Sequence, residues 1–552
     1  MKNAKSPILK SLIKSFRKAA FAEKHPHIDT DTLIQLESVD IYTRRKFLTD
    51  ATKTLTVLGI GSVLPFSACN SSNDKVQEKK TATEPPKPIN EKVKIAVVGG
   101  GIAGLNCAYQ LQKQGIIAQI YEGDKRVGGR IYTKENVLAQ GITTEYGGEF
   151  IDTNHEDVRN LAQELGLELY DTIADVEQNK LIKDAYFFNN QHYTEKQVIN
   201  EFRRIAKQIE TDLSKCGEDY NTPFCEKLDN TSLDGYVRSL KCAKWLQDLL
   251  IYAYVAEYGL DAGEQSALNL VDMISTDIKD GFAIFGDSDE RYKIKGGNSK
   301  LTEALKERLK NQIATDSKLV AIKAVGTSYT LIFDNKKEVL AEFVVLAIPF
   351  TVLRKIDLQI EGISEEKKKC IAELGYGQNN KLLLGFNSRP WRDGKSKYAG
   401  YLFHTDIQNG WDNAQMQNNN SGVGGYTVFV GGSPSIKMAQ LAQSQSLQDS
   451  IPDNLVQDYL LKLDSAFAGT KQQYNGIHKA ALWSNNPFVN ASYACYKVGQ
   501  WTTISGQEIE PIGNIFFAGE HCSEDFQGYM NGGAETGKRA AEGILSIVKK
   551  QK

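Results

Sequence analysis

The chain has 552 residues, of which 41% are hydrophobic and 24% charged, and it contains 46 glycines. This composition excludes disordered and fibrous proteins and predicts a globular chain of more than one domain, long enough for a large core. Residues 1–68 carry eleven Lys and Arg against six Asp and Glu, so the net charge of −2 divides into +5 for this leader and −7 for the remainder. An acidic body argues against nucleic acid as a partner.

The basic leader, residues 1–68, has the features of an export signal. Arg44 and Arg45 stand before Lys46-Phe47-Leu48, and the apolar run LTVLGIGSVLPFSAC follows. The paired arginines resemble a twin-arginine signal, and the run, about 14 residues long, is shorter than the ~20 that span a bilayer. We therefore expect the twin-arginine export machinery as a partner and the periplasm or the membrane surface as the location. The alternative is an ordinary cytosolic basic segment.

The cysteines allow two further interpretations. FSAC at 66–69 resembles a lipobox, with Phe66 where leucine is usual, and Cys69 would then carry a lipid anchor. Residues 69–92 are polar and contain prolines, as is typical of a solvated tether. Cys216 and Cys225 lie in an expected loop, where they either form a disulfide or stay as free thiols. The chain has no CxxC pair and no Cys/His cluster at zinc spacing, so we predict no metal site.

A glycine-rich turn follows the first expected strand. The β-branched run VKIAVV leads into the motif G-x-G-x-x-G, and the helical pattern LNCAYQLQKQG comes next. Here Gly99 permits the tight turn, Gly101 lets the backbone approach a pyrophosphate, and Gly104 lets the helix pack on the strand. A second expected strand, AQIYEG, ends at Glu122, 18 residues past Gly104, where a carboxylate can accept hydrogen bonds from ribose hydroxyls. Together these features predict a dinucleotide site.

Two further motifs distinguish between the dinucleotides. DKRVGGRIYT places Gly128, Gly129 and Arg130 just beyond the ribose acid, and a plain NAD site has no need of this second glycine pair. The segment IGNIFFAGEHCSEDFQGYMNGGAETGKRAAEGI, residues 512–544, reads as a strand, a Gly-Glu turn, a loop and a helix. Glu520 ends that strand, where an acid can meet a ribityl hydroxyl or a phosphate-bound arginine. The following glycine turn directs helix N–H groups toward the ligand.

These motifs resemble those of the flavin-containing amine oxidases, the family of monoamine oxidases, polyamine oxidases and L-amino acid oxidases. Other stretches match the family in the same order: TEYGGEFIDTNH, KIKGGNSKLTEAL, VVLAIPFTVL, YGQNNKLLLGFNSRPW and WSNNPFVNASYACY. The resemblance covers roughly residues 93–547. It implies FAD as the cofactor, a small amine or amino acid as the substrate, O2 as the electron acceptor and a homodimer as one form of assembly.

The resemblance also implies an α/β fold, α+β overall, with two interleaved domains. A Rossmann-like FAD-binding domain is expected from residues 93–152, 290–352 and 492–547, and a substrate domain of helices on an antiparallel sheet from residues 153–289 and 353–491. The hydropathy agrees, because 195–282 has helical spacing whereas 379–387 and 424–431 have strand patterns.

The residues expected to contact FAD lie in the glycine turn, the second glycine pair, the YGGEF segment, one central strand and the C-terminal motif. They are Gly99, Gly101, Ile102, Ala103, Gly104, Glu122, Arg126, Gly129, Arg130, Gly147, Gly148, Glu149, Phe150, Leu319, Val320, Gly519, Glu520, Gly528, Tyr529 and Met530.

Two residues are expected to act in the reaction. Lys381, in NNKLLLGF, matches the family lysine that holds a water near flavin N5 and assists the reaction with oxygen. Its alternation with Leu382 and Leu384 is also what a strand with one solvent-facing lysine shows. Tyr529, in GYMNGG, matches an aromatic residue that flanks the amine over the flavin face, the alternative being a core aromatic. Hydride transfer to N5 requires an uncharged amine, so the site needs a desolvated pocket rather than a strong base or a metal.

Positions that depart from the family bear on cofactor attachment. In monoamine oxidases a cysteine in the segment that matches NASYACY is linked to the flavin. We align Ala491 with it and leave Cys495 off register, so we expect non-covalent FAD. The second aromatic of the cage then falls near Ser492 or Tyr493, which leaves the cage half open.

The expected substrate pocket bears on specificity. Where venom-type amino acid oxidases use an arginine to bind the substrate carboxylate, this chain has Phe150, with Asp152 shortly after it. Acidic residues there suit a second cationic group on a diamine or polyamine, although an arginine elsewhere could hold a carboxylate. Trp391 and Trp483 match family tryptophans that line or buttress the pocket, with core packing as the alternative.

Three functions compete. The first is a flavin amine oxidase, and the second is an L-amino acid oxidase. The third is a flavoprotein of the cell envelope without oxidase turnover, which predicts a lost lysine or a broken C-terminal motif. Lys381 and GYMNGGAETG are both intact, which favours an oxidase. A desaturase-like dehydrogenase would use membrane quinones, and no amphipathic membrane stretch is evident in the body.

Overall fold

The computed structural model describes residues 93–550 except 218–219, 279–280, 394–396, 418–421 and 445. The described residues belong to one compact unit, Lys87–Lys552. The expected export signal, the lipobox at Cys69 and the expected tether at 69–92 lie outside the described residues and stay predictions. No described helix is long and apolar enough to cross a membrane.

A five-stranded parallel sheet forms the first layer of the fold, in the order β21-β13-β1-β2-β9. Its strands are β1 (Ile95–Val98), β2 (Ala118–Tyr121), β9 (Ile313–Ala314), β13 (Phe343–Leu346) and β21 (Ile515–Phe517). Every residue of β1 and β13 is buried, as expected for a parallel sheet covered on both faces. The sheet therefore joins segments that are far apart in the sequence.

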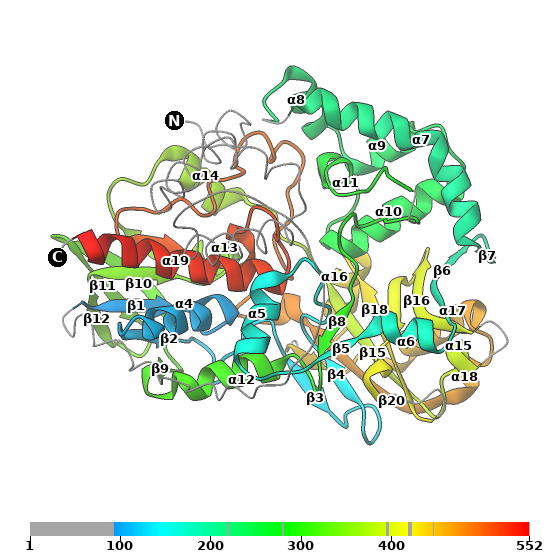
Figure 1. The fold of residues 1–552 in the computed structure, drawn as a ribbon, viewed down its shortest axis with the longest axis horizontal. Coiled ribbons are helices and arrows are strands. Elements are labelled where there is room, and N and C mark those ends of the chain that lie inside the picture. Colours follow the sequence, from blue (N-terminus) through cyan, green and yellow to red (C-terminus); the bar gives the residue numbers. More distant parts are fainter. Residues whose placement is uncertain are drawn as a thin grey trace, which may run out of the picture. The chain divides into compact units, whose positions relative to one another are not determined.

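Two helices from opposite ends of the described chain pack together beside this sheet: α4 (Ile102–Lys113) and α19 (Met530–Lys550) (Figure 1). A Cβ on Gly537 would lie 2.2 Å from the backbone oxygen of Ala103, so glycine permits this close approach. Both helices begin at the same end of the sheet, where the functional site lies.

A second, four-stranded sheet has the order β12-β11-β10-β14. Its strands are β10 (Leu319–Val325), β11 (Ser328–Phe333), β12 (Glu338–Ala341) and β14 (Asp357–Gln359), followed by α14 (Glu365–Glu373); α13 (Phe350–Leu353) lies between β13 and β14. One core cluster contains Leu331 and Phe333 of this sheet together with Val344 and Leu346 of the parallel sheet.

An eight-stranded sheet carries the other half of the site, in the order β19-β20-β15-β18-β17-β16-β6-β7. Its strands are β6 (Ile182–Phe188), β7 (Gln191–Tyr193), β15 (Asn380–Phe386), β16 (Tyr398–His404), β17 (Gln408–Asp412), β18 (Gly424–Val430), β19 (Gln448–Asp449) and β20 (Tyr474–Leu482). The strands expected at 379–387 and 424–431 are confirmed as β15 and β18.

The sheet expected to be antiparallel departs from that pattern at one pairing, because β6 pairs with β16 in parallel. A parallel pair needs a long crossover connection. The chain between these strands supplies one, since it contains a helical region and a return through the parallel sheet. The mixed α/β class is otherwise confirmed.

The helical region expected at 195–282 is confirmed (Figure 1). It contains α7 (Glu195–Cys216), α8 (Pro223–Asp229), α9 (Leu233–Ser239), α10 (Lys244–Tyr258) and α11 (Leu268–Val271). Thr194 and Gln197 form a capping box at the start of α7, which satisfies backbone donors of the first turn. Cys216 and Cys225 are both buried, they are not joined by a disulfide in this structure, and their side chains are hydrogen-bonded to each other.

The remaining strands and α-helices complete the described part of the chain. They are β3 (Thr133–Glu135), β4 (Thr143–Glu145), α5 (Glu156–Glu164), β5 (Leu169–Asp171), α6 (Thr172–Gln178), β8 (Tyr292–Ile294), α12 (Ser299–Arg308), α15 (Pro390–Asp393), α16 (Gly432–Gln440), α17 (Asp453–Ala466) and α18 (Thr470–Gln473). The three-segment division of the domains stays a prediction.

Candidate functional site

One continuous cavity connects the glycine turn after β1 with the eight-stranded sheet. At its first end Gly99 has a φ of +104°, a left-handed conformation that favours glycine. A Cβ on Gly104 would lie 2.0 Å from the Gly99 oxygen, whereas a Cβ on Gly101 would meet only the Cα of Gly129, 3.9 Å away. Gly104 therefore serves packing, and Gly101 leaves space beside the cavity.

Glu122 lies at the end of β2, as predicted. One oxygen of its carboxylate accepts a hydrogen bond of 2.6 Å from the Gly100 N–H, and the other accepts one of 2.7 Å from the Asp124 N–H. Burial raises the pKa of this carboxyl, while the two backbone N–H groups act in the opposite direction. These contacts hold the carboxylate at the cavity wall, where a ribose would lie.

The second glycine pair closes over the first turn. The Gly128 N–H donates a 2.8 Å hydrogen bond to the Gly100 oxygen. The Arg126 guanidinium donates to the Gly129 oxygen over 2.5 Å and lies above the Tyr132 ring. Arg126 therefore shapes this loop and also lines the cavity.

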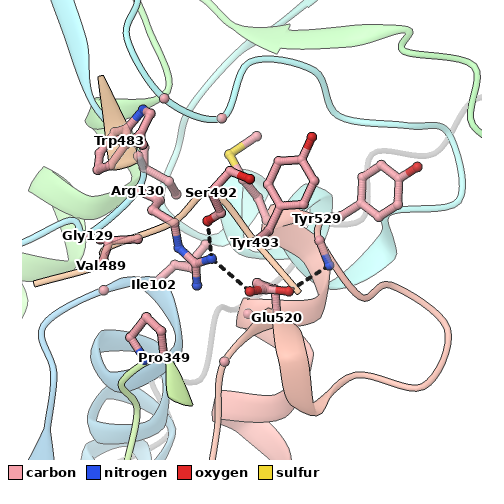
Figure 2. Close-up of a pocket in the computed structure, with 18 of the residues that line it drawn as sticks. Ile102, Gly129, Arg130, Pro349, Trp483, Val489, Ser492, Tyr493, Glu520 and Tyr529 are labelled. Atoms are coloured by element: carbon pink, nitrogen blue, oxygen red, sulfur yellow. Dashed lines mark hydrogen bonds and ion pairs between the residues drawn. The ribbon is translucent and has the colours of Figure 1, made fainter. Parts of the chain in front are cut away.

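Arg130 connects three distant parts of the chain (Figure 2). Its Nη1 donates hydrogen bonds of 2.7 Å to Glu520 Oε1 and to the Ser492 carbonyl oxygen. The other oxygen of Glu520 accepts a 2.9 Å bond from the Gly528 N–H. Glu520 is thus the partner of an arginine, one of the two roles expected for it, and this contact fixes the C-terminal motif against the second glycine pair.

The residues present fit a dinucleotide. The first turns of α4 and α19 both meet the cavity, through Ile102 and Ala103 on one helix and Met530 and Gly533 on the other. Helix N-termini present unpaired N–H groups and partial positive charge, which stabilise phosphate groups and an electron-rich ring. With Glu122 at the ribose position, this end of the cavity can hold FAD.

Lys381 lies on β15, and every residue of this strand is buried. The alternative of a solvent-facing lysine is therefore wrong, since Lys381 lines the cavity. Its ammonium donates 2.8 Å to Glu149 Oε2, 2.9 Å to the Gly147 oxygen and 3.1 Å to the Glu145 oxygen. The cation is held at one point of the cavity wall.

Glu149 is bound by two lysines. Its second oxygen accepts a 2.7 Å bond from Lys293, whose side chain is 1% exposed. Burial alone would raise the pKa of Glu149, but the ammonium groups of Lys293 and Lys381 outweigh it and lower that pKa to about 2. Sequence reasoning missed Lys293, because its place in KIKGGN is typical of an exposed strand end.

Two tyrosines line the cavity beyond the Arg130–Glu520 pair (Figure 2). In Figure 2 the hydroxyls of both tyrosines point away from that pair. Both hydroxyls reach one residue of α10, because Tyr493 donates to the Glu257 carbonyl oxygen and Tyr529 donates 3.1 Å to Glu257 Oε1. Tyr493 is one of the two positions expected for the second aromatic, and it lines the cavity together with Tyr529.

The segment expected to match the cofactor-attachment position places Ser492 at the cavity, as predicted. Ala491 is fully buried in the core. The Ser492 hydroxyl donates 2.6 Å to Asn379 Oδ1. Cys495 is buried with its sulfur beside Asn269. Among the described residues, no cysteine lines the cavity.

The structure brings most of the predicted residues to the cavity, and three of them lie elsewhere. Gly104 serves packing, and Val320 is 37% exposed, because neighbouring strand residues face opposite ways and Leu319 takes the cavity side. Trp391 is 1% exposed and donates to Asp412 Oδ2, so the prediction of a pocket tryptophan is wrong there. Its ring packs on Phe386 within the core of the large sheet.

The other predicted pocket residues line the cavity. Trp483 donates 2.8 Å to the Tyr146 oxygen, and Phe150 lies edge-on to Trp411 with ring centroids 5.3 Å apart. Asp152 is joined there by Glu257 and Glu290, which sequence reasoning missed. Glu257 could have been found from the sequence, because it is the one acidic residue in the apolar pattern IYAYVAEYG. Glu290 could not, because it follows other acidic residues in a loop and no pattern sets it apart.

No group of His, Cys, Asp and Glu in the described part of the chain could hold a metal ion. The fold and the site define a flavin-dependent oxidoreductase.

Residues 102–545 match the model of the flavin containing amine oxidoreductase family, and the chain belongs to this family. FAD is the cofactor typical of the family. The chain is 24% identical over 478 residues to amine oxidase [flavin-containing] A of Sus scrofa, covering 83% of this chain and 86% of that protein. It is 23% identical over 488 residues to amine oxidase [flavin-containing] B of Homo sapiens, covering 84% and 88%.

Solved structures share the fold. A wild-type putrescine oxidase bound to putrescine superposes with a TM-score of 0.68 at 19% identity, covering 82% of this chain and 99% of that one. Cyclohexylamine oxidase from Brevibacterium oxydans IH-35A superposes with a TM-score of 0.69 at 20% identity, covering 83% and 99%.

Proposed function

We propose that this protein is an FAD-dependent oxidase that oxidises the C–N bond of an amine. The product is an imine, which water hydrolyses to an aldehyde and ammonia, and O2 is reduced to hydrogen peroxide. The observation that carries this proposal is the pair Tyr493 and Tyr529, which line the same cavity as Lys381 beyond the dinucleotide end. Its relatives support it, since putrescine oxidase and cyclohexylamine oxidase are named as oxidases of amines.

The chain's own residues prepare the amine. When bound, FAD supplies an acceptor for the hydride from the carbon next to nitrogen and passes the electrons to O2. The two tyrosine rings orient the amine between them, and the apolar walls Phe150, Trp411 and Phe429 exclude water. Desolvation disfavours an ammonium ion, so it raises the share of neutral amine whose lone pair is free.

An L-amino acid is disfavoured as the substrate by the charges in the cavity. Arg126 and Arg130 line its dinucleotide end and are bonded to backbone oxygens and to Glu520. Within the described residues, no arginine lines the end beyond the tyrosines, and three carboxyls do. A substrate carboxylate there would meet repulsion without a bidentate partner.

We expect substrate-dependent release of hydrogen peroxide from the purified holoenzyme with primary amines. Peroxide is measured by a coupled peroxidase assay over a panel of alkylamines, arylalkylamines and L-amino acids. Turnover of amines at least tenfold above that of amino acids, about 1.4 kcal/mol in the barrier, is the expected pattern. The reverse pattern would identify an amino acid oxidase, and no peroxide with any substrate would support a role without oxidase turnover.

We further propose that FAD is bound without a covalent link, because neither Ala491 nor Ser492 offers a thiol. The expected result is that acid precipitation releases all of the FAD into the supernatant, where its absorbance is compared with that of the intact enzyme. Flavin that remains with the washed pellet, or a peptide heavier by the mass of FAD, would overturn this proposal.

A further inference from the structure

Three carboxyl groups gather at the end of the cavity that the proposed oxidation does not use. Asp152 follows the segment that carries Glu149, Glu257 lies on α10, and Glu290 precedes β8. The Asp152 carboxylate accepts a 2.8 Å hydrogen bond from the Glu290 N–H, so these two residues are in direct contact. All three line the cavity, although they come from distant parts of the sequence.

This acidic group lies beyond the tyrosine cage. Tyr529 follows Gly528 in the chain, and the Gly528 N–H donates a hydrogen bond to Glu520. Tyr493 follows Ser492, and the Ser492 carbonyl oxygen accepts a hydrogen bond from Arg130. The backbone ends of both tyrosines therefore lie near the Arg130–Glu520 pair. The hydroxyls at the opposite ends of both rings bind Glu257. The cage therefore leads from the cofactor side to the acidic group, and a chain-like molecule between the rings would extend toward the three carboxyls.

The three carboxyls are mutually destabilised as anions. Burial and then the charges of Asp152 and Glu257 raise the pKa of Glu290 to about 8. Burial raises the pKa of Glu257 to about 7; the hydrogen bond from the Tyr529 hydroxyl lowers this pKa, and the charge of Asp152 raises it further. Burial likewise raises the pKa of Asp152 to about 6. A cation placed among them would relieve this repulsion.

The neighbouring basic residues do not neutralise the negative charge of Asp152, Glu257 and Glu290. Lys183 acts on Glu290, but its strongest electrostatic partner is Asp184. His155 Nε2 lies 3.2 Å from Asp152 Oδ2. Burial lowers the pKa of His155 to about 4, so this imidazole carries no charge near neutral pH. Within the described residues, neither Glu257 nor Glu290 forms an ion pair with lysine or arginine.

We propose that Asp152, Glu257 and Glu290 form a subsite for a second ammonium group, and that the substrate is an aliphatic diamine or polyamine. The identity of the reacting end rests on the proposed oxidase function, whereas the subsite itself rests on the carboxyls. The two ends of the cavity treat nitrogen in opposite ways. The aromatic walls favour the neutral amine that reacts, and the acidic group favours the charged amine that anchors it.

The experiment measures binding without turnover. Holoenzyme whose flavin has been reduced under nitrogen is titrated with 1,4-diaminobutane and with 1-aminobutane, and the dissociation constants are determined by calorimetry. We expect the diamine to bind at least tenfold more tightly, about 1.4 kcal/mol. In Glu290→Gln this preference should fall below about threefold, or about 0.65 kcal/mol, while binding of the monoamine changes little. Glu257→Gln should reduce the preference in the same way. Glutamine keeps an acceptor for Tyr529 at position 257.

Two controls separate this role from a structural one. Glu168→Gln makes the same substitution at a side chain that is 76% exposed, and it should leave the preference intact. The melting temperature of Glu290→Gln at pH 8 should equal or exceed that of the wild type. The reason is that the pKa of this carboxyl is higher in the folded chain than in the unfolded one, so its ionisation above the unfolded pKa costs stability.

The outcomes are distinguishable. Equal affinity of the wild type for the two amines, or equal loss of both in the variants, would overturn the subsite. Tight diamine binding by an enzyme that no amine reduces would leave the subsite standing and remove the proposed oxidase function.

Discussion

Replacing Lys381 by methionine should slow reoxidation of the reduced flavin by O2 at least tenfold, about 1.4 kcal/mol in the barrier, and leave its reduction by an amine largely intact. The expected cause is loss of the ammonium that Glu149 and two carbonyl oxygens hold at the cavity wall. Methionine keeps most of the side-chain length and packing. Stopped-flow mixing measures the two half-reactions separately, first with amine under nitrogen and then with oxygenated buffer.

Lys293→Met is the matched control. It removes the other ammonium bound to Glu149, but Lys293 does not line the cavity. Both variants break part of a buried ion-pair cluster, so both should have a lower melting temperature. Only Lys381→Met should affect reoxidation. A rate within about twofold of the wild type, ~0.4 kcal/mol, would make Lys381 a structural lysine, and equal slowing in both variants would assign the effect to the charge on Glu149.

Gly101→Val should yield a folded protein that has lost most of its FAD. Gly101 has a φ of −73° and a ψ of 179°, which valine adopts without strain. A Cβ there has only the Gly129 Cα, 3.9 Å away, as a neighbour. The added methyl groups would occupy space where a pyrophosphate approaches the backbone. We expect FAD affinity to fall about 100-fold, ~2.7 kcal/mol, with unchanged far-ultraviolet circular dichroism.

Gly104→Ala is the matched comparison, and it should lose stability instead of FAD affinity. Its Cβ would lie 2.0 Å from the Gly99 oxygen, so α4 cannot pack on β1 without a backbone shift. This variant should be poorly soluble or much less stable, whatever the FAD concentration. If Gly101→Val retained FAD at the wild-type ratio of flavin to protein, the placement of the pyrophosphate at this turn would be wrong.

The cofactor half of the site is readable from the sequence because its determinants are local. Gly99, Gly101 and Gly104 belong to one strand-turn-helix unit, and Glu122 ends the next strand of the same unit. Each residue is placed by backbone geometry over a few positions, so spacing along the chain translates directly into position in space. The strand that carries Lys381 was readable for the same reason, since its alternation is a local pattern.

Where sequence reasoning failed, a contact between distant segments decided the outcome. Trp391, on the short helix α15, is held in the core by Asp412 at the end of β17. The parallel pairing of β6 with β16 likewise depends on strands that the sequence separates by the whole helical region.

The sequence by itself determined the family, the mixed α/β class and a dinucleotide site for FAD, because these follow from local motifs in their chain order. Only the tertiary structure decided the substrate end of the cavity: the second tyrosine wall, the binding of Glu149 by two lysines, and the meeting of Asp152, Glu257 and Glu290. The physical reason is that charge and burial are properties of neighbours in space. A glutamate on an apolar helix and another after an acidic loop carry no shared pattern, and folding alone brings their carboxyls to one cavity, where burial and repulsion change their chemistry.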